Sequence, residues 1–462
     1  MSEESNPKPD SKSKIVQVHD RKLSLLQSAF DQVAAEKKEH QTRTRATRGP
    51  GGEAKGTEEA RPNPAQPIIG DITDYVVEVH EDPSKKMTLK KAERRERGIV
   101  DTAKYCGKLA AGMAESMWDA VVHNDPAAFN SYKAQLTQKF GDCDPTYAEA
   151  LKKYADFILH DGTIPYIPAR GGEDQFGVVE GKLPADAMIG IVGDWGTGEK
   201  EALDVLKQIK KKNPQVVIHL GDIYYAGTQF EVDNYFYKPW HDILELDHSG
   251  ITAFTLPGNH DYYSGGDPYY DMIKKLDQPA SFFCLRNKDW QLIGMDTALH
   301  DKLGGPPTVL EESEAAWVID KIKNADGRRT VLLSHHQLIS ANDQFEKKYY
   351  NEPLYNQLKD VLPQVDMWIW GHEHDLVIFG EDEKLGLKRG RLVGGSAFPV
   401  GKDEMPSTPK NPDVIFDKNV ALGKGAAFYQ HCYAMMKLDG KKATVEYYQD
   451  NDENKPLYTE QI

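Results

Sequence analysis

The sequence has no long hydrophobic run, and this absence limits what kind of protein it can be. No apolar segment approaches the length of about 20 residues that a transmembrane helix needs. The first residues, MSEESNPKPDSKSK, also lack the apolar stretch of a secretory signal. We therefore expect no membrane span and a cytoplasmic protein.

Cysteine is scarce, which argues against a disulfide framework or a structural zinc site. The four cysteines, which form no CxxC pair, are Cys106, Cys143, Cys284 and Cys432. We interpret them as small buried side chains in a reducing compartment rather than as redox or metal-binding groups.

Basic residues are fewer than acidic ones: the chain has 57 Lys and Arg and 72 Asp and Glu, which gives a net charge of −15. An extended nucleic-acid surface is therefore not expected, because phosphate backbones attract basic faces. A small phosphorylated substrate remains compatible with this charge, because bound cations reverse the local field in a site built from carboxylates.

The 462 residues exceed one average domain, and their composition changes along the chain. Residues 1–66 are rich in Lys, Glu, Ser, Pro and Gly, and this composition predicts a mostly disordered segment. One possible helix, Leu23–Val33, has apolar residues at helical spacing. It would either pack on the chain itself or dock on a protein partner.

Residues 67–185 form a second region, predicted to be a helical accessory region. Its stretch from Arg97 to His160 is mostly helical in pattern, with breaks near Pro126 and Pro145. It contains no recognisable chemical motif, and the sequence leaves its role open.

Residues 186–462 are predicted to form the catalytic domain. Short apolar runs, each ending in Gly and polar residues, alternate with amphipathic stretches such as Lys200–Lys212 and Glu311–Ala325. This alternation is typical of an α/β fold whose sheet is covered on both faces. The runs are AMIGIVGD, QVVIHLGD, ITAFTLPGN, TVLLSHH and DMWIWGHEH.

Polar residues follow these runs directly. Strand ends in α/β sheets are where ligands bind, so we expect these side chains to converge on one edge. Taken singly, each is as typical of a turn, a helix cap or a core histidine as of a site, but their ordered combination favours a metal centre. The predicted ligands are Asp194, Asp222, Asn259, His335, His372 and His374.

Carboxylates and imidazoles suit Fe, Mn, Zn or Ni better than Ca. Two such ions, roughly 3.5–4 Å apart, can clamp a phosphoryl group and lower the pKa of a bound water to about 7. His260 follows Asn259 directly and is predicted to protonate the leaving oxygen or to stabilise phosphoryl charge. Asp261 would either orient His260 or cap the following turn.

These motifs resemble the calcineurin-like metallophosphoesterase superfamily over roughly residues 186–450, and within it the purple acid phosphatases. The block GDWG lacks the histidine that many relatives carry two residues after the aspartate. The block GDIYYAG places Tyr225 where purple acid phosphatases have a metal-binding tyrosine, and Tyr224 beside it would then have a packing role.

The resemblance implies a β-sheet sandwich flanked by helices and two metal ions, Fe(III) plus a divalent Fe, Mn or Zn. One ion would bind Asp194, Asp222, Tyr225 and His374. The other would bind Asp222, Asn259, His335 and His372, with Asp222 bridging. The block SHHQ departs from the family pattern, and His336 is proposed as a substitute for a substrate-binding histidine.

The leading functional prediction is hydrolysis of a phosphate monoester by attack of a metal-bound hydroxide. The alternative is a phosphodiesterase acting on a nucleotide or lipid ester, with Trp195, Tyr262 and Tyr263 stacking on the leaving group or packing structurally. A non-catalytic metal-bearing scaffold is a third possibility, but every expected ligand position is filled.

Overall fold

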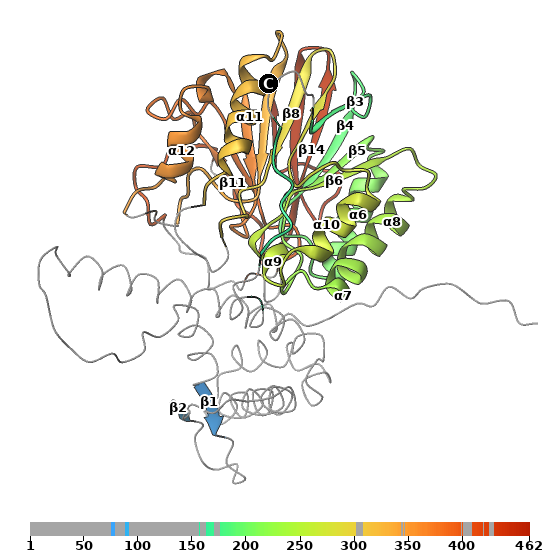
Figure 1. Ribbon diagram of the computed structural model, residues 1–462, viewed down its shortest axis with the longest axis vertical. Coiled ribbons are helices and arrows are strands. Elements are labelled where there is room, and N and C mark those ends of the chain that lie inside the picture. Colours follow the sequence, from blue (N-terminus) through green and yellow to red (C-terminus); the bar gives the residue numbers. More distant parts are fainter. Residues whose placement is uncertain are drawn as a thin grey trace, which may run out of the picture.

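The computed structural model describes the C-terminal two thirds of the chain and two short segments before it (Figure 1). The predicted helix at Leu23–Val33 and the predicted helical stretch Arg97–His160, apart from Phe157, lie outside the described residues. The described residues are 75–78, 88–91, 157, 163–170, 176–301, 308–342, 345, 347–398, 400, 409–418, 420–424 and 429–462.

A small antiparallel hairpin precedes the main body. It pairs β1 (Tyr75–Glu78) with β2 (Thr88–Lys91), in a region whose sequence pattern did not predict strands.

One sheet has six strands, in the order β16-β15-β14-β4-β5-β6. Strands β4, β5 and β6 run parallel, whereas β14, β15 and β16 form an antiparallel C-terminal meander that joins the sheet through β14 and β4. The strands are β4 (Met188–Val192), β5 (Val216–His219), β6 (Thr252–Thr255), β14 (Cys432–Asp439), β15 (Lys442–Gln449) and β16 (Tyr458–Gln461).

The other sheet has eight strands, in the order β13-β11-β12-β10-β9-β8-β7-β3. Its centre is parallel, because β8, β9, β10 and β12 all pair in parallel. The strands are β3 (Val178–Glu180), β7 (Phe283–Arg286), β8 (Trp290–Met295), β9 (Arg329–Ser334), β10 (Met367–Trp370), β11 (Leu376–Phe379), β12 (Gly390–Val393) and β13 (Phe416–Lys418).

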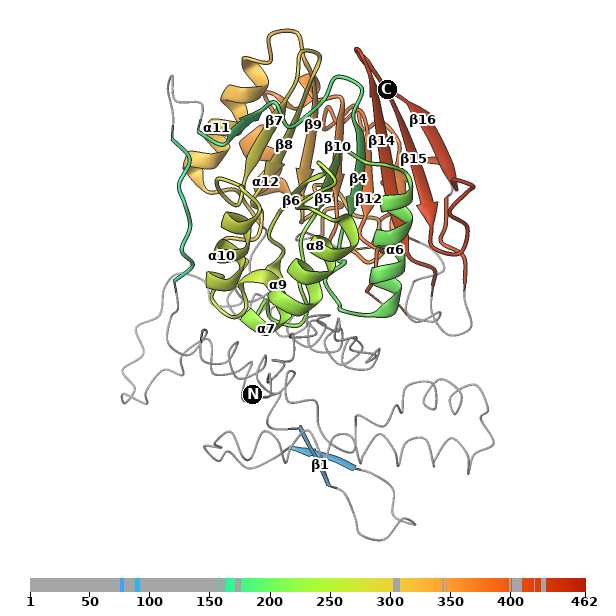
Figure 2. The same cartoon turned by 90° about the vertical axis from the view of Figure 1, so that its right-hand side faces the viewer.

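The two sheets pack face to face, and helices cover their outer faces (Figures 1 and 2). Apolar residues of both sheets, such as Ile191 and Leu333, form the central core. Helices α6 (Lys200–Lys211), α8 (Lys238–Leu244) and α10 (Asp267–Lys275) lie on the six-stranded sheet. Helices α11 (Glu312–Lys323) and α12 (Glu352–Leu358) lie on the eight-stranded sheet.

This arrangement confirms the predicted β-sheet sandwich flanked by helices, and each sheet is covered on both faces as expected. Each sheet is buried on both sides, but one of its covers is the other sheet. The apolar runs fit both arrangements, because a strand buried on both faces reads as a continuous hydrophobic run in either case.

The predicted helices form because one face of each is apolar. In α6, Ala202, Leu206 and Ile209 recur at helical spacing and are buried against the sheet. Among the described residues, no helix is long and apolar enough to cross a bilayer. Four shorter helical segments complete the described structure: α7 (Gln229–Glu231), η1 (Val232–Tyr237), α9 (Asn259–Tyr262) and η2 (Leu362–Gln364).

Candidate metal centre

Three predicted ligands lie on loops with a backbone conformation that side chains rarely adopt. Asp194, Asp222 and His372 each follow a glycine shortly after a strand, and their φ angles are 56°, 78° and 71°. Left-handed φ at non-glycine residues is costly and is concentrated at functional sites. The backbone therefore turns sharply at these three positions and directs their side chains to one place.

The first cluster of polar atoms surrounds Nε2 of His335. This atom lies 3.1 Å from Oδ1 of Asn259, 3.2 Å from Nδ1 of His372 and 3.4 Å from Oδ1 of Asp222. Nδ1 of His335 lies 3.0 Å from the carbonyl oxygen of Leu220. Because a carbonyl only accepts, Nδ1 carries the proton and Nε2 presents a lone pair to the cluster.

The amide of Asn259 is oriented in the same way. Its Nδ2 donates to the hydroxyl of Tyr263 at 2.6 Å, which leaves Oδ1 facing the cluster. Close packing fixes the loop that carries it, since a Cβ added at Gly258 would lie 2.0 Å from Oδ1 of Asp222. Only glycine permits this approach.

The second cluster surrounds the hydroxyl of Tyr224. It lies 2.9 Å from Oδ2 of Asp222, 3.1 Å from Oδ1 of Asp194 and 3.1 Å from Nε2 of His374. The one hydroxyl proton can serve only one of the two carboxylates. Asp222 contributes one oxygen to each cluster, so its carboxylate lies between them.

Of the two adjacent tyrosines, Tyr224 places its hydroxyl among the predicted ligands. The backbone of Tyr225 binds Glu231 and His260. The contacts therefore favour Tyr224 as the phenolic ligand, whereas the sequence predicted Tyr225 in that role and Tyr224 in packing. The coordination of Tyr225 itself stays a prediction.

Burial and mutual charge shift the pKa values of these groups. Burial, followed by the charge of Asp222, raises the pKa of Asp194 well above its ordinary value. Burial alone would also raise the pKa of Asp222, but His335, His260 and His372 lower it below its usual range. Burial lowers the pKa of His335, which keeps its imidazole neutral and able to bind a metal.

These residues fit a pair of cations. Nε2 of His335, Oδ1 of Asn259 and the carboxylates of Asp194 and Asp222 present lone pairs to the two clusters, and positive charge placed there would satisfy them. The groupings Asp194–Asp222–His374 and His335–His336–His372 each bring potential ligand atoms within 4.8 Å of one another. Nitrogen and carboxylate oxygen donors suit transition metals.

His260 lies beside the clusters rather than within them, as predicted. Its Nδ1 lies 2.7 Å from the carbonyl oxygen of Tyr225, and its Nε2 lies 4.0 Å from Oδ2 of Asp222. Nδ1 therefore donates to the carbonyl, and Nε2 faces the centre. The backbone N–H of His260 also donates to Oδ1 of Asp222 at 3.1 Å.

Asp261 holds a turn instead of orienting His260. Its Oδ2 accepts from the backbone N–H of Asp222 at 2.8 Å and from that of Gly258 at 2.7 Å. The carbonyl of Tyr225, which the sequence did not single out, takes the orienting role that was considered for Asp261.

Residues 187–376 match the family model of the calcineurin-like phosphoesterases. This part of the chain is therefore similar to that family. The match covers all of the predicted Asp, Asn and His ligands, and the family is one of hydrolases. No curated protein matches the chain.

Several solved structures are similar to the chain at low sequence identity. A purple acid phosphatase from yellow lupin (Lupinus luteus) seeds is 16% identical, covers 61% of this chain and 54% of its own, and has a TM-score of 0.43. This chain therefore spans about half of the lupin enzyme. The anchor GAP50 of the inner membrane complex of Plasmodium is 14% identical, with coverages of 60% and 89% and a TM-score of 0.41. A dimetal phosphatase from Danio rerio is 12% identical, with coverages of 58% and 97% and a TM-score of 0.37.

His336 is buried, and both of its ring nitrogens have partners. Nδ1 lies 3.0 Å from Oγ1 of Thr297, and Nε2 lies 3.0 Å from Oδ2 of Asp301. Its ring centroid lies 4.5 Å from that of His372. These contacts suit a residue that packs against His372 and holds its ring in place. The role of His336 in substrate binding stays a prediction. Thr297 and Asp301 carry no motif that would have marked them in the sequence.

The aromatic residues proposed to stack on a leaving group mostly belong to the core of the domain. Trp195 is fully buried and donates to the carbonyl of Ala202 at 2.7 Å. Tyr262 is buried and donates to Asp296 at 2.6 Å. Tyr263 contacts Asn259, and its ring lies 4.7 Å from that of His260. The packing role therefore applies to Trp195 and Tyr262.

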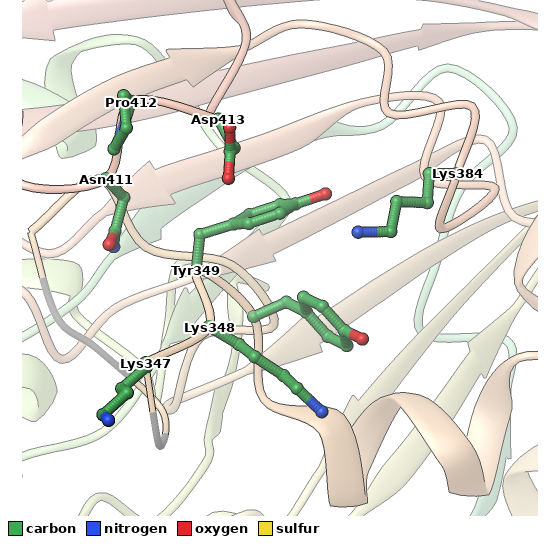
Figure 3. Close-up of a pocket in the computed structure, with 8 residues that line it drawn as sticks. Lys347, Lys348, Tyr349, Lys384, Asn411, Pro412 and Asp413 are labelled. Carbon is green, nitrogen blue, oxygen red and sulfur yellow. The ribbon is translucent and has the colours of Figure 1, made fainter.

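A separate pocket of about 210 Å³ lies away from the ligand residues, none of which lines it (Figure 3). Lys384 extends over the ring of Tyr349, with its Nζ 5.5 Å from the ring centroid. Lys348, which also lines the pocket, is paired with Glu352. The pocket wall carries three lysines, the third being Lys347, and one carboxylate, Asp413, and we assign no ligand to it.

Proposed function

We propose that the chain hydrolyses phosphate monoesters with two bound metal ions. The observation that carries this proposal is the position of Asp222, whose two carboxylate oxygens face two separate clusters of lone-pair donors. A carboxylate shared between two cations offsets their repulsion, and paired cations are the means by which many phosphatases clamp a phosphoryl group.

The proposed ligands divide between the two positions. Asp194, Asp222, His374 and Tyr224 would hold one ion, and Asp222, Asn259, His335 and His372 would hold the other. Bound cations would supply Lewis-acid polarisation of the phosphoryl oxygens and an acidified water. With the phenolic oxygen of Tyr224 or Tyr225 among the donors, we propose Fe(III) at the first position and a divalent Fe, Mn or Zn at the second.

The protein supplies the proton-transfer group. Nδ1 of His260 donates to a carbonyl, so a second proton on the ring must reside on Nε2, the atom that faces the centre. From there the imidazolium can donate to the leaving oxygen as the ester bond breaks. The ring is buried and packs against Tyr224 and Tyr263, which restricts its rotation.

Two related esters test the choice of substrate class. We expect the metal-loaded protein to hydrolyse p-nitrophenyl phosphate and to leave bis(p-nitrophenyl) phosphate largely intact. The opposite preference would establish the phosphodiesterase alternative. That alternative is weakened by the burial of Trp195 and Tyr262, which removes two of its three proposed stacking residues.

The scaffold alternative predicts no turnover of any ester by a fully loaded protein. The chain carries His260 as well as each ligand, which a scaffold has no need to retain. A protein with two ions per chain and no activity across a panel of phosphomonoesters and diesters would establish the scaffold role.

A further inference from the structure

The carboxylate of Glu231 is fully buried and is enclosed by one loop. It accepts a hydrogen bond from the backbone N–H of Tyr225, which is a short contact. Its other oxygen accepts from the N–H of Ala226 at 3.1 Å, the N–H of Thr228 at 2.9 Å and the Thr228 hydroxyl at 3.0 Å. One side chain therefore satisfies three backbone donors of residues 225–228.

This arrangement is specific to a carboxylate. Both oxygens of Glu231 only accept, and four donors point at them. An amide in the same place would present an NH₂ group to N–H donors on one side. Burial raises the pKa of Glu231, and the backbone donors of Tyr225, Thr228 and Ala226 oppose that rise.

The peptide unit held by Glu231 also holds His260. The N–H of Tyr225 binds the carboxylate, and the carbonyl of the same residue accepts from Nδ1 of His260 at 2.7 Å. Tyr225 therefore transmits the position of Glu231 to the imidazole. A shift of this residue would rotate the ring and move Nε2 away from its place 4.0 Å from Oδ2 of Asp222.

We propose that Glu231 is a positioning residue for proton transfer by His260, acting through the Tyr225 backbone. This inference rests on the proposed function, because it assigns to Glu231 an effect on leaving-group protonation. Glu231 does not touch the clusters, so its removal should affect the proton step more than metal binding.

The test compares two monoesters that differ in how much their leaving groups need a proton. Glycerol 2-phosphate releases an alkoxide and depends on the acid, whereas p-nitrophenyl phosphate releases a stabilised phenolate. We expect E231Q to lower kcat for glycerol 2-phosphate by about 10²-fold, the cost of a misplaced catalytic group, and to change kcat for p-nitrophenyl phosphate much less. Metal content should stay near that of the wild type.

T228A is the matched control in the same loop. It removes the hydroxyl that binds Glu231 but leaves the Tyr225 contact, so it should lower stability without changing the ratio of the two kcat values. Should E231Q prove too unstable to assay, E231D provides a second variant that keeps the charge but draws the carboxylate back from Tyr225.

A double-mutant cycle separates positioning from general damage to the fold. If Glu231 acts through His260, adding E231Q to H260A should cost little further activity on glycerol 2-phosphate. The proposal would be overturned if the fold-losses in kcat of the two single variants multiplied in the double variant. An equal loss of kcat on both esters in E231Q would also overturn it.

A structural readout keeps the inference separate from the proposed function. A wild type inactive on both esters would contradict the function and leave the geometry to be tested. A crystal structure of E231Q should then show a lost or lengthened contact between Nδ1 of His260 and the carbonyl of Tyr225. An unchanged contact would overturn the inference about Glu231.

Discussion

At the scale of single residues, the assignment of His260 depends on which ring nitrogen faces the centre. Nδ1 is occupied by the Tyr225 carbonyl, so Nε2 is the atom positioned to transfer a proton. We expect H260A to lower turnover by about 10²–10⁴-fold while metal content stays near normal. Steady-state kinetics with metal analysis would measure both, and H248A, at an exposed histidine, is the control. Unchanged turnover would remove His260 from the mechanism.

The two tyrosines make distinct spectroscopic predictions. If the Tyr224 phenolate binds Fe(III), aerobically purified protein should be coloured by charge transfer from the phenolate. Y224F should then abolish the visible band, and Y225F should keep it, because the Tyr224 hydroxyl lies with Asp194, Asp222 and His374. Bleaching in Y225F alone would restore the assignment made from the sequence. An iron-replete protein without colour would show that neither tyrosine coordinates the iron.

The convergence of the Asp, Asn and His side chains could be predicted because each follows an apolar run, and strand ends meet at one edge. The choice between Tyr224 and Tyr225 could not be made from the sequence. Adjacent loop residues point in different directions, and the sequence pattern does not indicate which of the two side chains faces inward. Glu231 was missed for a related reason. A glutamate in the first turn of a short helix is ordinary in sequence, and only the fold shows that it is buried.

At the scale of elements, the turn after β6 depends on Asp261. Its Oδ2 binds the backbone N–H groups of Asp222 and Gly258, which joins the loops after β5 and β6. D261A would leave two buried donors without this partner, and an unsatisfied buried donor costs about 1–3 kcal/mol. We expect a lower unfolding temperature and reduced metal retention. D360A, at an exposed carboxylate, is the control, and equal stability of the two variants would contradict the role of Asp261.

The strands β4, β5, β6, β9 and β10 could be predicted, because short apolar runs bounded by glycine have few alternative structures. The distribution of these strands between two sheets could not be predicted. Strand β14 pairs with β4, with Ala434 opposite Ile191, and no local pattern encodes a contact over that separation. The sequence indicated buried strands correctly and left open whether helices or a second sheet would bury them.

At the scale of the whole molecule, a buried ion pair connects the two sheets. Arg391 in β12 makes two contacts of 2.7 Å with Glu460 in β16, and Tyr447 also donates to Glu460 at 2.7 Å. R391M would remove the closest cation of the buried Glu460 carboxylate and leave only Arg389, whose Nε lies 3.8 Å from Oε2 of Glu460. Breaking a buried ion pair typically costs about 3–5 kcal/mol. We expect a clearly lower midpoint of denaturant unfolding.

The double variant R391M/E460M is the control for that prediction. Replacing both partners with apolar side chains removes the unpaired charge, so much of the lost stability should return. A double variant as unstable as R391M would show that the ion pair is not the source of the loss. Activity of the folded fraction should be unaffected, because neither residue contacts the candidate metal centre.

The carboxylate of Asp222 has one further consequence. If two ions bind as proposed, the ion at one position changes the affinity of the other position, and the factor is the same in either direction. The first ion fixes the carboxylate of Asp222, so the second ion binds to a side chain that is already in place. We therefore expect both metal positions to fill over a narrow range of metal concentration. Half-loaded protein would then be a minor species at equilibrium.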